Sequence, residues 1–472
     1  MSILIGCDSF LSLRNVRNGD LGRKLEGEQL VVLVDPNQYV GSTEVAPPGA
    51  EVRCLLDFDV RKEPDLLPLV NRAYWARKSY YDPLTHWQRV KFACYSRNRS
   101  NPIRRVASLL RGEVTIGYYW LAGRRGRAQS WRQQVGDAFQ AHSITEEYQC
   151  LLEDLGADVV ASFSPEGLRE MALIESARKM GLPTAVMIRS LDNLSAKIQH
   201  LPDADAYLVW SEATRDFLLY MYPELAANQV HVTGSPQFDH HLDPSFRLAR
   251  EEFFGQLGLD PNRPLVVYTC ATPGLIPHEI EIAQHLADAV HNGKLVQFAQ
   301  LLVRGHPRMF GSNFPLLHRT YPGVAVYPTP SPHTYQSSEH EAAIIRLILE
   351  DEPMHLSVLA YQDVQVNVSG TMIVDSAILD KPVIGIYYDI PANTPSSLST
   401  RRFYRRSDMR PIVSSGGLRL AHSPEECITL INHYLTDPTE DAYGRQKIRE
   451  RECGPIGNGG ENIATILRSL LR

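Results

Sequence analysis

The sequence has few of the features that indicate a metal-structured, disulfide-bonded or membrane-spanning protein. Its seven cysteines are scattered, and none forms a CxxC pair or lies beside a histidine at the spacing of a zinc site. Reduced thiols are therefore expected instead of a disulfide framework. No stretch approaches the roughly 18 apolar residues that a membrane-spanning helix needs, and the N-terminal MSILIGCDSF lacks the basic region and long apolar run of a signal peptide. These absences predict a cytoplasmic protein, or one that is peripheral at the inner face of a membrane.

A large excess of one charge is also missing. The 54 acidic and 48 basic residues leave a net charge of −6, which gives no reason to expect a nucleic-acid partner. What the chain does have is a content of 43% hydrophobic and 22% charged residues, which is typical of a globular protein with a full core. A length of 472 residues is too great for one ordinary domain, so two or three domains are expected.

Short apolar strands alternate with segments of helical period along most of the chain. Strands that are apolar on both faces and joined by helices predict parallel sheets covered by helices on each side. The expected strands are residues 2–7, 29–35, 157–163, 183–188, 204–210 and 229–234, and then residues 264–271, 299–307, 324–328, 363–369 and 382–388. We therefore predict two doubly wound α/β domains, residues 1–243 and 244–452, and a C-terminal helix in residues 453–472. Ligands of such sheets bind at the carboxyl ends of the strands, and two facing sheets would place the site in a cleft.

A long helical segment, about residues 64–148, interrupts the alternation in the first domain. It contains the basic runs RNRSNPIRRVASLLRG (97–112) and GRRGRAQSWR (123–132). One interpretation is a solvated helical insertion. The other is a surface for an anionic acceptor or for lipid headgroups.

The stretch VNVSGTMIVDSAIL (366–379) places small polar residues where a buried strand turns into a helix. The unpaired N–H groups at a helix N-terminus attract anions, Gly370 allows a close approach, and the hydroxyls of Ser369 and Thr371 add donors. Asp375 lies one turn further along and can accept a hydrogen bond from a ribose hydroxyl. The pattern indicates a phosphate site, with an ordinary capped helix as the alternative.

Two more predicted strands of the second domain end in polar residues. LLVRGHPRMF (301–310) places Arg304, His306, Pro307 and Arg308 at a strand end, where the arginines supply fixed charge and the histidine can donate to a phosphate. YTCATPG (268–274) offers Thr269 and Thr272 at another strand end. A simple strand-to-helix turn is the alternative for this second stretch.

Three such strand ends in one domain resemble the nucleotide-binding domain of GT-B glycosyltransferases. More narrowly, His306-Pro307 followed by Ser369-Gly370-Thr371 resembles bacterial surface-polysaccharide enzymes, namely the Kdo- and sialyl-transferases with a His-Pro motif and the CDP-glycerol glycerophosphotransferases. The stretches RSLDNLSAK (189–197), VHVTGSPQFD (230–239) and GPIGNGGENIATIL (454–467) are similar to the same group. The similarity covers about residues 155–472. It implies an α/β fold of the GT-B type, with two Rossmann-like domains facing a cleft and a C-terminal helix crossing back to the first domain.

The resemblance also implies roles for the residues at matching positions. His306, Ser369 and Thr371 would contact the donor phosphate, and Asp375 would hold the ribose or the sugar. The family usually has a glutamate at that last position, so Asp375 is one methylene shorter. The donor site predicted from the residues and the resemblance together consists of Arg304, His306, Pro307, Thr272, Ser369, Gly370, Thr371 and Asp375.

An inverting transferase also needs a general base in the first domain, which removes the proton of the acceptor hydroxyl. Asp8 follows the first strand and Asp192 follows the strand at 183–188. Either carboxylate could instead cap a turn. We prefer Asp192, with Asp8 as the second candidate, and His306 as a catalytic residue that stabilises charge on the leaving nucleotide.

The sequence thus predicts a metal-independent, inverting glycosyltransferase for surface-polysaccharide synthesis, with a CMP- or UDP-linked sugar as donor and a glycan or lipid-linked acceptor. The alternatives are a CDP-glycerol-type polyol-phosphate transferase, a sugar-nucleotide epimerase of the same fold, which would need additional acid–base carboxylates, and a non-catalytic nucleotide-binding scaffold. No cofactor or metal is expected, because the phosphate site supplies the charge. DFD (57–59) and DAD (203–205) match the DxD pattern of metal-dependent transferases, but such short patterns are common.

Overall fold

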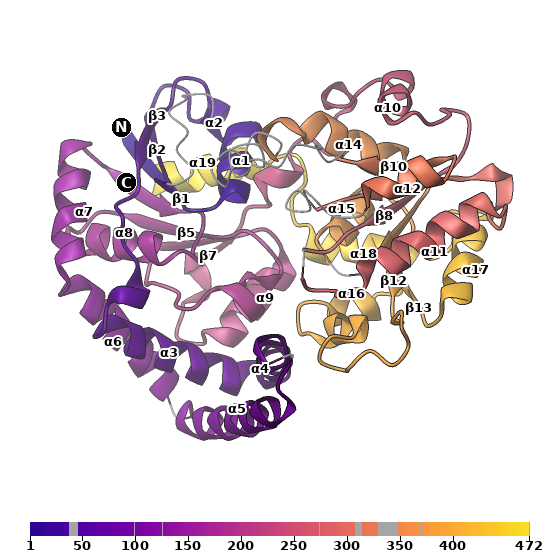
Figure 1. The fold of residues 1–472 in the computed structure, drawn as a ribbon. Helices are drawn as coiled ribbons and strands as arrows, with labels where there is room; N and C mark the ends of the chain where they lie inside the picture. The colour runs from indigo at the N-terminus through magenta and orange to yellow at the C-terminus, as the bar shows by residue number, and fades with distance from the viewer. Residues whose placement is uncertain are drawn as a thin grey trace. The chain divides into compact units, whose positions relative to one another are not determined.

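The computed structural model describes residues 1–36, 46–98, 100–124, 126–272, 274–306, 314–328, 348–368 and 370–471. The chain forms two compact units. Unit 1 consists of Met1–Asp239 and Cys453–Arg472, and unit 2 of His240–Glu452. Each unit is an α/β structure built around one parallel sheet (Figure 1).

The sheet of unit 1 has seven strands in the order β3-β2-β1-β4-β5-β6-β7, all parallel. All residues of the central strands β1, β4, β5 and β6 are buried, as expected for strands covered by helices on both faces. The strands are β1 (Ser2–Cys7), β2 (Gln29–Val34), β3 (Glu51–Cys54), β4 (Val159–Ser162), β5 (Thr184–Ile188), β6 (Ala206–Val209) and β7 (Val230–Val232).

The helices of unit 1 include the helical segment expected from the sequence, which is confirmed. The asparagine or aspartate before a proline starts two of these helices. Asp82 accepts a hydrogen bond from the Thr85 N–H at the start of α4, and Asn101 accepts one from the Arg104 N–H at the start of α5. The helices are α1 (Phe10–Asn18), α2 (Leu21–Lys24), α3 (Leu66–Tyr81), α4 (Pro83–Arg97), α5 (Pro102–Ala122), α6 (Arg127–Gln140), α7 (Ser143–Asp154), α8 (Leu168–Lys179), α9 (Glu212–Met221) and α19 (Gly459–Ser469), with the shorter turns η2 (Val60–Lys62), η3 (Asn193–Lys197), η4 (Ala227–Gln229) and η5 (Pro236–Phe238).

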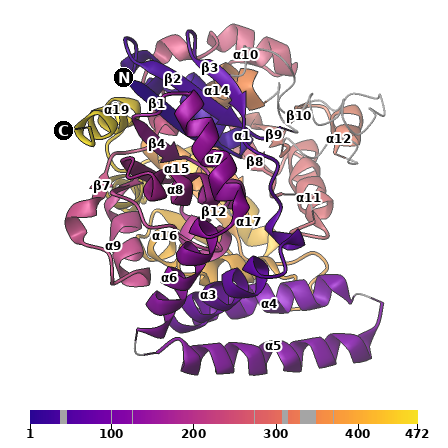
Figure 2. The same cartoon turned by 90° about the vertical axis from the view of Figure 1, so that its left-hand side faces the viewer.

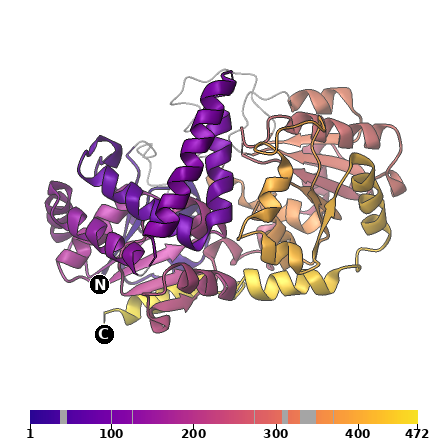
Figure 3. The same cartoon turned by 90° about the horizontal axis from the view of Figure 1, so that it is seen from below.

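Helices α4 and α5 form a long hairpin on the outside of unit 1. Figure 2 shows α5 beyond α4 and α3, at the edge of the unit furthest from its sheet, and Figure 3 shows the hairpin lengthwise, with its two helices side by side. Helix α5 packs against α3 and α4. Among the described residues, no helix is both long and apolar enough to cross a membrane.

Asp239 explains why two stretches of unit 1 that are distant in sequence lie together. Its carboxylate accepts hydrogen bonds from the N–H groups of Gly459 and Gly460, at 2.7 and 3.0 Å, and from Asp20 N–H at 3.2 Å. A carboxylate at a helix N-terminus satisfies donors that the helix leaves unpaired. The end of VHVTGSPQFD therefore fixes the start of α19, and the glycines of GPIGNGG have a structural role in this contact.

The sheet of unit 2 has six parallel strands in the order β10-β9-β8-β11-β12-β13. The strands are β8 (Leu265–Thr269), β9 (Gln300–Arg304), β10 (Val324–Tyr327), β11 (Val364–Asn367), β12 (Val383–Ile386) and β13 (Leu418–Ala421). The helices are α10 (Arg250–Leu257), α11 (Glu279–His291), α12 (Pro315–Thr320), α14 (Glu352–Tyr361), α15 (Met372–Ile378), α16 (Arg410–Ser414), α17 (Pro424–Thr436) and α18 (Ala442–Glu452), with the turns η6 (Pro244–Phe246), η7 (Val296–Phe298) and η8 (Thr400–Arg405).

Every strand predicted from the sequence is present, within three residues at each end. Within the described parts of the chain, two strands were missed, β3 and β13, which are the outermost strands of their sheets on one side. Edge strands are often short and carry charged side chains, which weakens the apolar signal. β3 is EVRC and β13 is LRLA, each with an arginine in only four residues.

Candidate functional site

The carboxyl edge of the unit 1 sheet has a switch point between β1 and β4. The chain leaves β1 towards β2 and β3, and it returns to the other side of β1 with β4. Ligands of doubly wound sheets bind outside the carboxyl ends of the strands at such a point. Asp8 directly follows β1 here, and the loop of residues 163–167 directly follows β4.

Arg169, in the first turn of α8, joins carboxylates from three neighbouring strand ends. Its Nη1 atom lies 3.1 Å from Oδ1 of Asp8, which follows β1, and 3.0 Å from Oδ1 of Asp35, which follows β2. Its Nη2 atom lies 3.3 Å from Oδ1 of Asp57, beyond the end of β3. We call Asp8, Asp35, Asp57 and Arg169 the Arg169 cluster. Asp57 belongs to the DFD pattern, and the structure gives it an arginine as partner.

Glu170, the next residue of α8, is a buried acceptor behind this cluster. Its Oε1 atom accepts the N–H of Asp8 at 2.5 Å, and its Oε2 atom accepts the hydroxyl of Ser162 at 2.6 Å and the N–H of Ser164 at 2.9 Å. These bonds tie the ends of β1 and β4 to α8. Gly167 completes the arrangement, because a Cβ atom there would lie 2.4 Å from Oδ2 of Asp8.

Burial raises the pKa of both carboxyl groups. The pKa of Asp8 is raised to about 6, mainly by burial and against the opposing charge of Arg169, with Asp35 and Glu166 adding to the rise. The pKa of Glu170 is raised to about 7, first by burial and second by the charge of Asp8, against the hydrogen bond from Ser162. The Asp8 side chain keeps 13% exposure, whereas Glu170 is fully buried. Asp8 is therefore the carboxyl group of the two that a substrate can reach, and its pKa is suited to proton transfer near neutral pH.

Glu166 and Arg189 add an ion pair to the same edge. Glu166 lies in the loop after β4, and Arg189 directly follows β5. Sequence reasoning identified Asp8 but missed Glu166, Arg169 and Glu170. The signal was present, since SFSPEGLRE (162–170) places three charged residues between a strand end and the first turn of a helix.

Asp192, the preferred base of the sequence prediction, lies in the turn after β5 and before η3. Its Oδ1 atom accepts the hydroxyl of Ser190 at 2.6 Å and lies 2.9 Å from the ammonium of Lys197. Lys78 of α3 also holds this turn in place, because its buried ammonium donates a hydrogen bond to the Leu194 carbonyl. One oxygen of Asp192 therefore interacts with both the Lys197 ammonium and the Ser190 hydroxyl. Such a carboxylate is suited to holding Lys197 in position at least as well as to removing a proton.

In unit 2 the structure places three predicted strand ends side by side. β8 lies between β9 and β11, so the ends of YTCATPG, LLVRGHP and VNVSGT share one edge, and the switch point lies between β8 and β11. Thr269 connects the two strands at this switch point, because its hydroxyl accepts hydrogen bonds from the amide groups of Gln365, at 3.2 Å, and of Asn367. Thr272 is exposed beyond the end of β8.

Glu279 is the counterpart in unit 2 of Glu170 in unit 1. It is the first residue of α11 and accepts the N–H of Ala271 at 2.6 Å. Burial raises the pKa of Glu279 to about 7, against the hydrogen bond from Ala271. In both units a buried glutamate in the first turn of a helix therefore holds the backbone that follows a central strand.

In the RGHP stretch (304–307), Arg304 already has partners within the protein. Arg304, the last residue of β9, forms an ion pair with Asp351, and its guanidinium lies 5.3 Å from the centre of the Tyr327 ring. The Tyr327 hydroxyl donates to Asp351 at 2.8 Å. A phosphate would therefore share Arg304 with Asp351. His306 is half-buried just beyond the strand end, and Pro307 and Arg308 lie outside the described residues.

The Ser-Gly-Thr stretch precedes α15, a helix of seven residues. Thr371 is its N-cap residue, and Ser369 lies outside the described residues. A Cβ atom on Gly370 would meet only the Asn367 amide nitrogen, at 3.8 Å, which is an ordinary contact. The packing of the protein alone therefore does not require a glycine at position 370. A ligand that approaches the backbone closely would require one.

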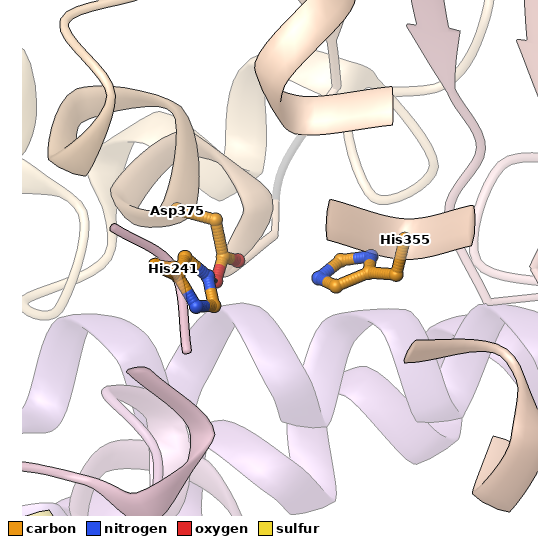
Figure 4. A group of neighbouring side chains, drawn as sticks. All are labelled: His241, His355 and Asp375. Carbon is orange, nitrogen blue, oxygen red and sulfur yellow. Dashed lines mark hydrogen bonds and ion pairs between the residues drawn. The ribbon is translucent and has the colours of Figure 1, made fainter. Parts of the chain in front are cut away.

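Asp375 lies inside α15 and is paired with a histidine. Nε2 of His241 lies 2.8 Å from Oδ1 of Asp375, and the two side chains are each 1% exposed. Figure 4 shows His355, from α14, beside this pair, and the ligand atoms of the three residues all lie within 4.8 Å of one another. Two histidines and a carboxylate are a ligand set for Zn²⁺ or a similar ion. The 2.8 Å separation is, however, that of a hydrogen bond, so the pair shares a proton in this arrangement.

The comparisons with known proteins identify the fold. No family model and no curated protein matches this chain. S. aureus MnaA, solved with UDP, matches 100% of this chain over 96% of its own length, with a TM-score of 0.53 and 10% identity. The UDP-GlcNAc 2-epimerase of Neisseria meningitidis, solved with UDP-GlcNAc, matches 99% of this chain over 100% of its own, with a TM-score of 0.52 and 11% identity. The enzyme of the same name from Methanocaldococcus jannaschii matches 99% over 99%, with a TM-score of 0.51 and 12% identity.

Identities this low show the fold alone. The two parallel sheets and these matches over the full chain confirm the predicted fold class, an α/β fold of the GT-B type with two Rossmann-like domains. The narrower resemblance to Kdo-, sialyl- and glycerophosphotransferases stays a hypothesis.

Proposed function

We propose that this protein acts on a nucleotide-activated sugar and that Asp8 carries out acid–base chemistry on the sugar, with epimerisation as the leading reaction. The observation that carries the proposal is the group of carboxylates at the switch point of unit 1, in which Asp8 has a pKa of about 6 and lies beside Arg169, Asp35 and Glu166. An epimerase needs more than one acid–base carboxylate, and Asp35, which shares Arg169 with Asp8, is the second candidate at this edge. The solved structures of similar fold, whose names specify UDP-GlcNAc 2-epimerases, favour the same reaction class.

The proposed chemistry begins with removal of a proton from the sugar carbon next to the anomeric carbon. As a carboxylate takes this proton, the C–H electron pair forms a double bond to the anomeric carbon, and the bond to the nucleotide phosphate breaks with its electron pair leaving on the phosphate oxygen. The nucleotide then adds back while a carboxylic acid returns a proton to the opposite face. The sugar is inverted at one carbon, and no oxidant or reductant is consumed.

Unit 2 is proposed to hold the nucleotide. The support is the row of strand ends at β8, β9 and β11, with Thr269 and Asn367 between two of them and Gly370 free of any packing requirement for glycine. In this proposal Thr371 and His306 donate hydrogen bonds to the nucleotide phosphate. Thr272 and Arg304 are the other residues of the proposed phosphate site. The reaction is proposed to need no metal.

Inverting glycosyl transfer is the second candidate, and the burial of Glu170 favours it. Of the two carboxyl groups at this edge with a raised pKa, Glu170 is fully buried and accepts three hydrogen bonds inside the protein, so Asp8 is the one that a substrate can reach. Transfer needs one base only. Asp8 would take the proton of an acceptor hydroxyl as its oxygen bonds to the anomeric carbon and the nucleotide leaves. The donor would be a CMP- or UDP-linked sugar and the acceptor a surface glycan or glycolipid. Transfer of a polyol phosphate from a CDP-linked donor would use the same residues.

Incubation in D₂O distinguishes these reactions. The protein is mixed with UDP-GlcNAc, other UDP-hexosamines, CMP-linked ulosonic acids and CDP-glycerol, and the nucleotide-linked product is followed by proton NMR. Epimerisation predicts a second sugar-nucleotide with deuterium at the inverted carbon. Transfer predicts release of free nucleotide that depends on an added acceptor and brings no deuterium into the recovered donor. Unchanged spectra for all donors, with and without glycan acceptors, would contradict the proposed function.

A further inference from the structure

Helix α5 presents its large apolar side chains to the outside. Ile103, Val106, Leu110, Val114, Tyr118 and Leu121 are between 56% and 82% exposed. Their spacing of three or four residues places all six on one side of the helix. A surface helix of a globular protein normally turns such a stripe towards the core.

The side of α5 that faces the protein has its own packing contacts, in which small residues lie beside a few large ones such as Tyr119, whose ring contacts Trp75 and Trp131. Its buried residues are Gly112, Ile116 and Ala122. A Cβ atom on Gly112 would lie 2.6 Å from Cγ1 of Val90 in α4, so the glycine allows the two helices to pack closely. Helix α5 is therefore held against α3 and α4 by its inner side, and the exposed apolar stripe takes no part in that packing.

The sequence on both sides of this stripe is strongly basic. From residue 83 to residue 127 the only acidic residue is Glu113, and the basic residues are Arg89, Lys91, Arg97, Arg99, Arg104, Arg105, Arg111, Arg124, Arg125 and Arg127. Exposed Arg104 and Arg111 lie along one border of the stripe, and the Arg124 guanidinium lies 3.7 Å from the centre of the Trp120 ring near its C-terminal end. The whole chain has a net charge of −6, so this charge is local.

We propose that α5 is a membrane-docking helix that lies flat on an anionic bilayer, with its apolar stripe among the acyl chains and its arginines at the lipid headgroups. An apolar face, a basic border and interfacial tyrosine and tryptophan are the features that hold a helix in the plane of a membrane interface. The positive charge favours an anionic lipid surface over a second copy of this chain, because two copies meeting at α5 would bring their arginines together. The proposal is independent of the reaction that the protein catalyses.

Flotation of the full-length protein with lipid vesicles tests this proposal. Vesicles of phosphatidylcholine are compared with vesicles that also contain phosphatidylglycerol, at low and high salt. We expect binding to the anionic vesicles that weakens with salt. The triple variant Ile103→Ser, Leu110→Ser, Val114→Ser should bind about a hundredfold less tightly or worse, and the pair Arg104→Glu, Arg111→Glu about tenfold less tightly or worse.

The matched control removes two apolar side chains of similar exposure from unit 2, Phe298→Ser and Tyr443→Ser, which are 79% and 70% exposed. This control should bind vesicles as the unaltered protein does, and all variants should melt as it does, since the altered side chains are exposed. Absence of binding to anionic vesicles, or equal binding by the triple variant, would overturn the proposal. So would a concentration-dependent dimer, seen by ultracentrifugation without vesicle binding and dissociated by the triple variant, because the stripe would then belong to a second copy.

Discussion

His241 and Asp375 form a buried hydrogen-bonded pair, with Nε2 of the histidine 2.8 Å from Oδ1 of the aspartate and both side chains 1% exposed. Asp375 is the residue that the sequence assigns to a ribose or sugar hydroxyl. The pair shows that this carboxylate is buried and already has a protein partner, so a ribose hydroxyl would have to join this hydrogen-bonded network.

Removing the histidine should destabilise unit 2. His241→Ala leaves a buried carboxylate without this partner, and we expect a loss of about 2 kcal/mol or more in the free energy of unfolding. Urea unfolding measures it. The control is His278→Ala, because His278 pairs with Glu281 at the surface and its loss should cost about 0.5 kcal/mol or less. Equal effects of the two variants would show that the His241–Asp375 pair has no special weight in the fold.

Asp8 and Asp192 should respond differently to the same substitution. Asp8→Asn removes the proton acceptor while keeping its size, so turnover should fall about 10²- to 10⁴-fold with little change in nucleotide affinity. Asp192→Asn should have a much smaller effect, since that carboxylate is shared with Lys197 and Ser190. Steady-state kinetics and calorimetry with the nucleotide measure both quantities. The reverse order of effects would return the role of base to Asp192.

The pH dependence of the reaction should report the environment of Asp8. A base acts when deprotonated, so kcat/KM should fall as the pH drops below about 6, the raised pKa of Asp8. Arg169 lowers that pKa by its charge and hydrogen bond. Arg169→Met should therefore raise it, and the acid limb should move to higher pH by about one unit or more. If the acid limb does not move in this variant, the group that titrates in the pH profile is not Asp8.

Gly370 should matter for nucleotide binding and hardly for folding. A methyl group at position 370 meets only an ordinary contact in the protein, so Gly370→Ala should leave the melting temperature nearly unchanged. It should weaken nucleotide affinity about tenfold if a phosphate approaches the backbone there. Gly255→Ala in α10 is the control, because a Cβ atom there meets nothing within 4 Å. Unchanged affinity in Gly370→Ala would remove this turn from the nucleotide site.

The sequence predicts the parts of this protein that depend on local pattern. Buried strands such as QLVVLV and TAVMI stand out as apolar runs, and polar residues at the ends of β8, β9 and β11 mark one sheet edge. The Arg169 cluster could not be predicted in this way. Arg169 and Asp8 are 161 residues apart, and their contact depends on β4 pairing with β1.

Pairing also decides which polar residues remain available for a ligand. Arg304 reads as a free phosphate ligand in the sequence, but the fold gives it Asp351 as partner. Asp192 likewise follows a strand end as predicted, and its partner Lys197 comes from the next turn of the same segment. The sequence shows the type and position of these residues. It does not show which of them form ion pairs within the protein and are therefore less available to a ligand.

Binding of nucleotides to the full-length protein is the most direct test of the central claim that this is a nucleotide-sugar enzyme. Melting temperatures are measured with UDP, UMP, CMP, CDP, GDP and ADP, with and without EDTA. A ligand that binds the folded state alone raises the melting temperature. We predict a rise with a uridine or cytidine nucleotide that EDTA leaves unchanged. No rise with any of the six would contradict the nucleotide site of unit 2, and with it the proposed function.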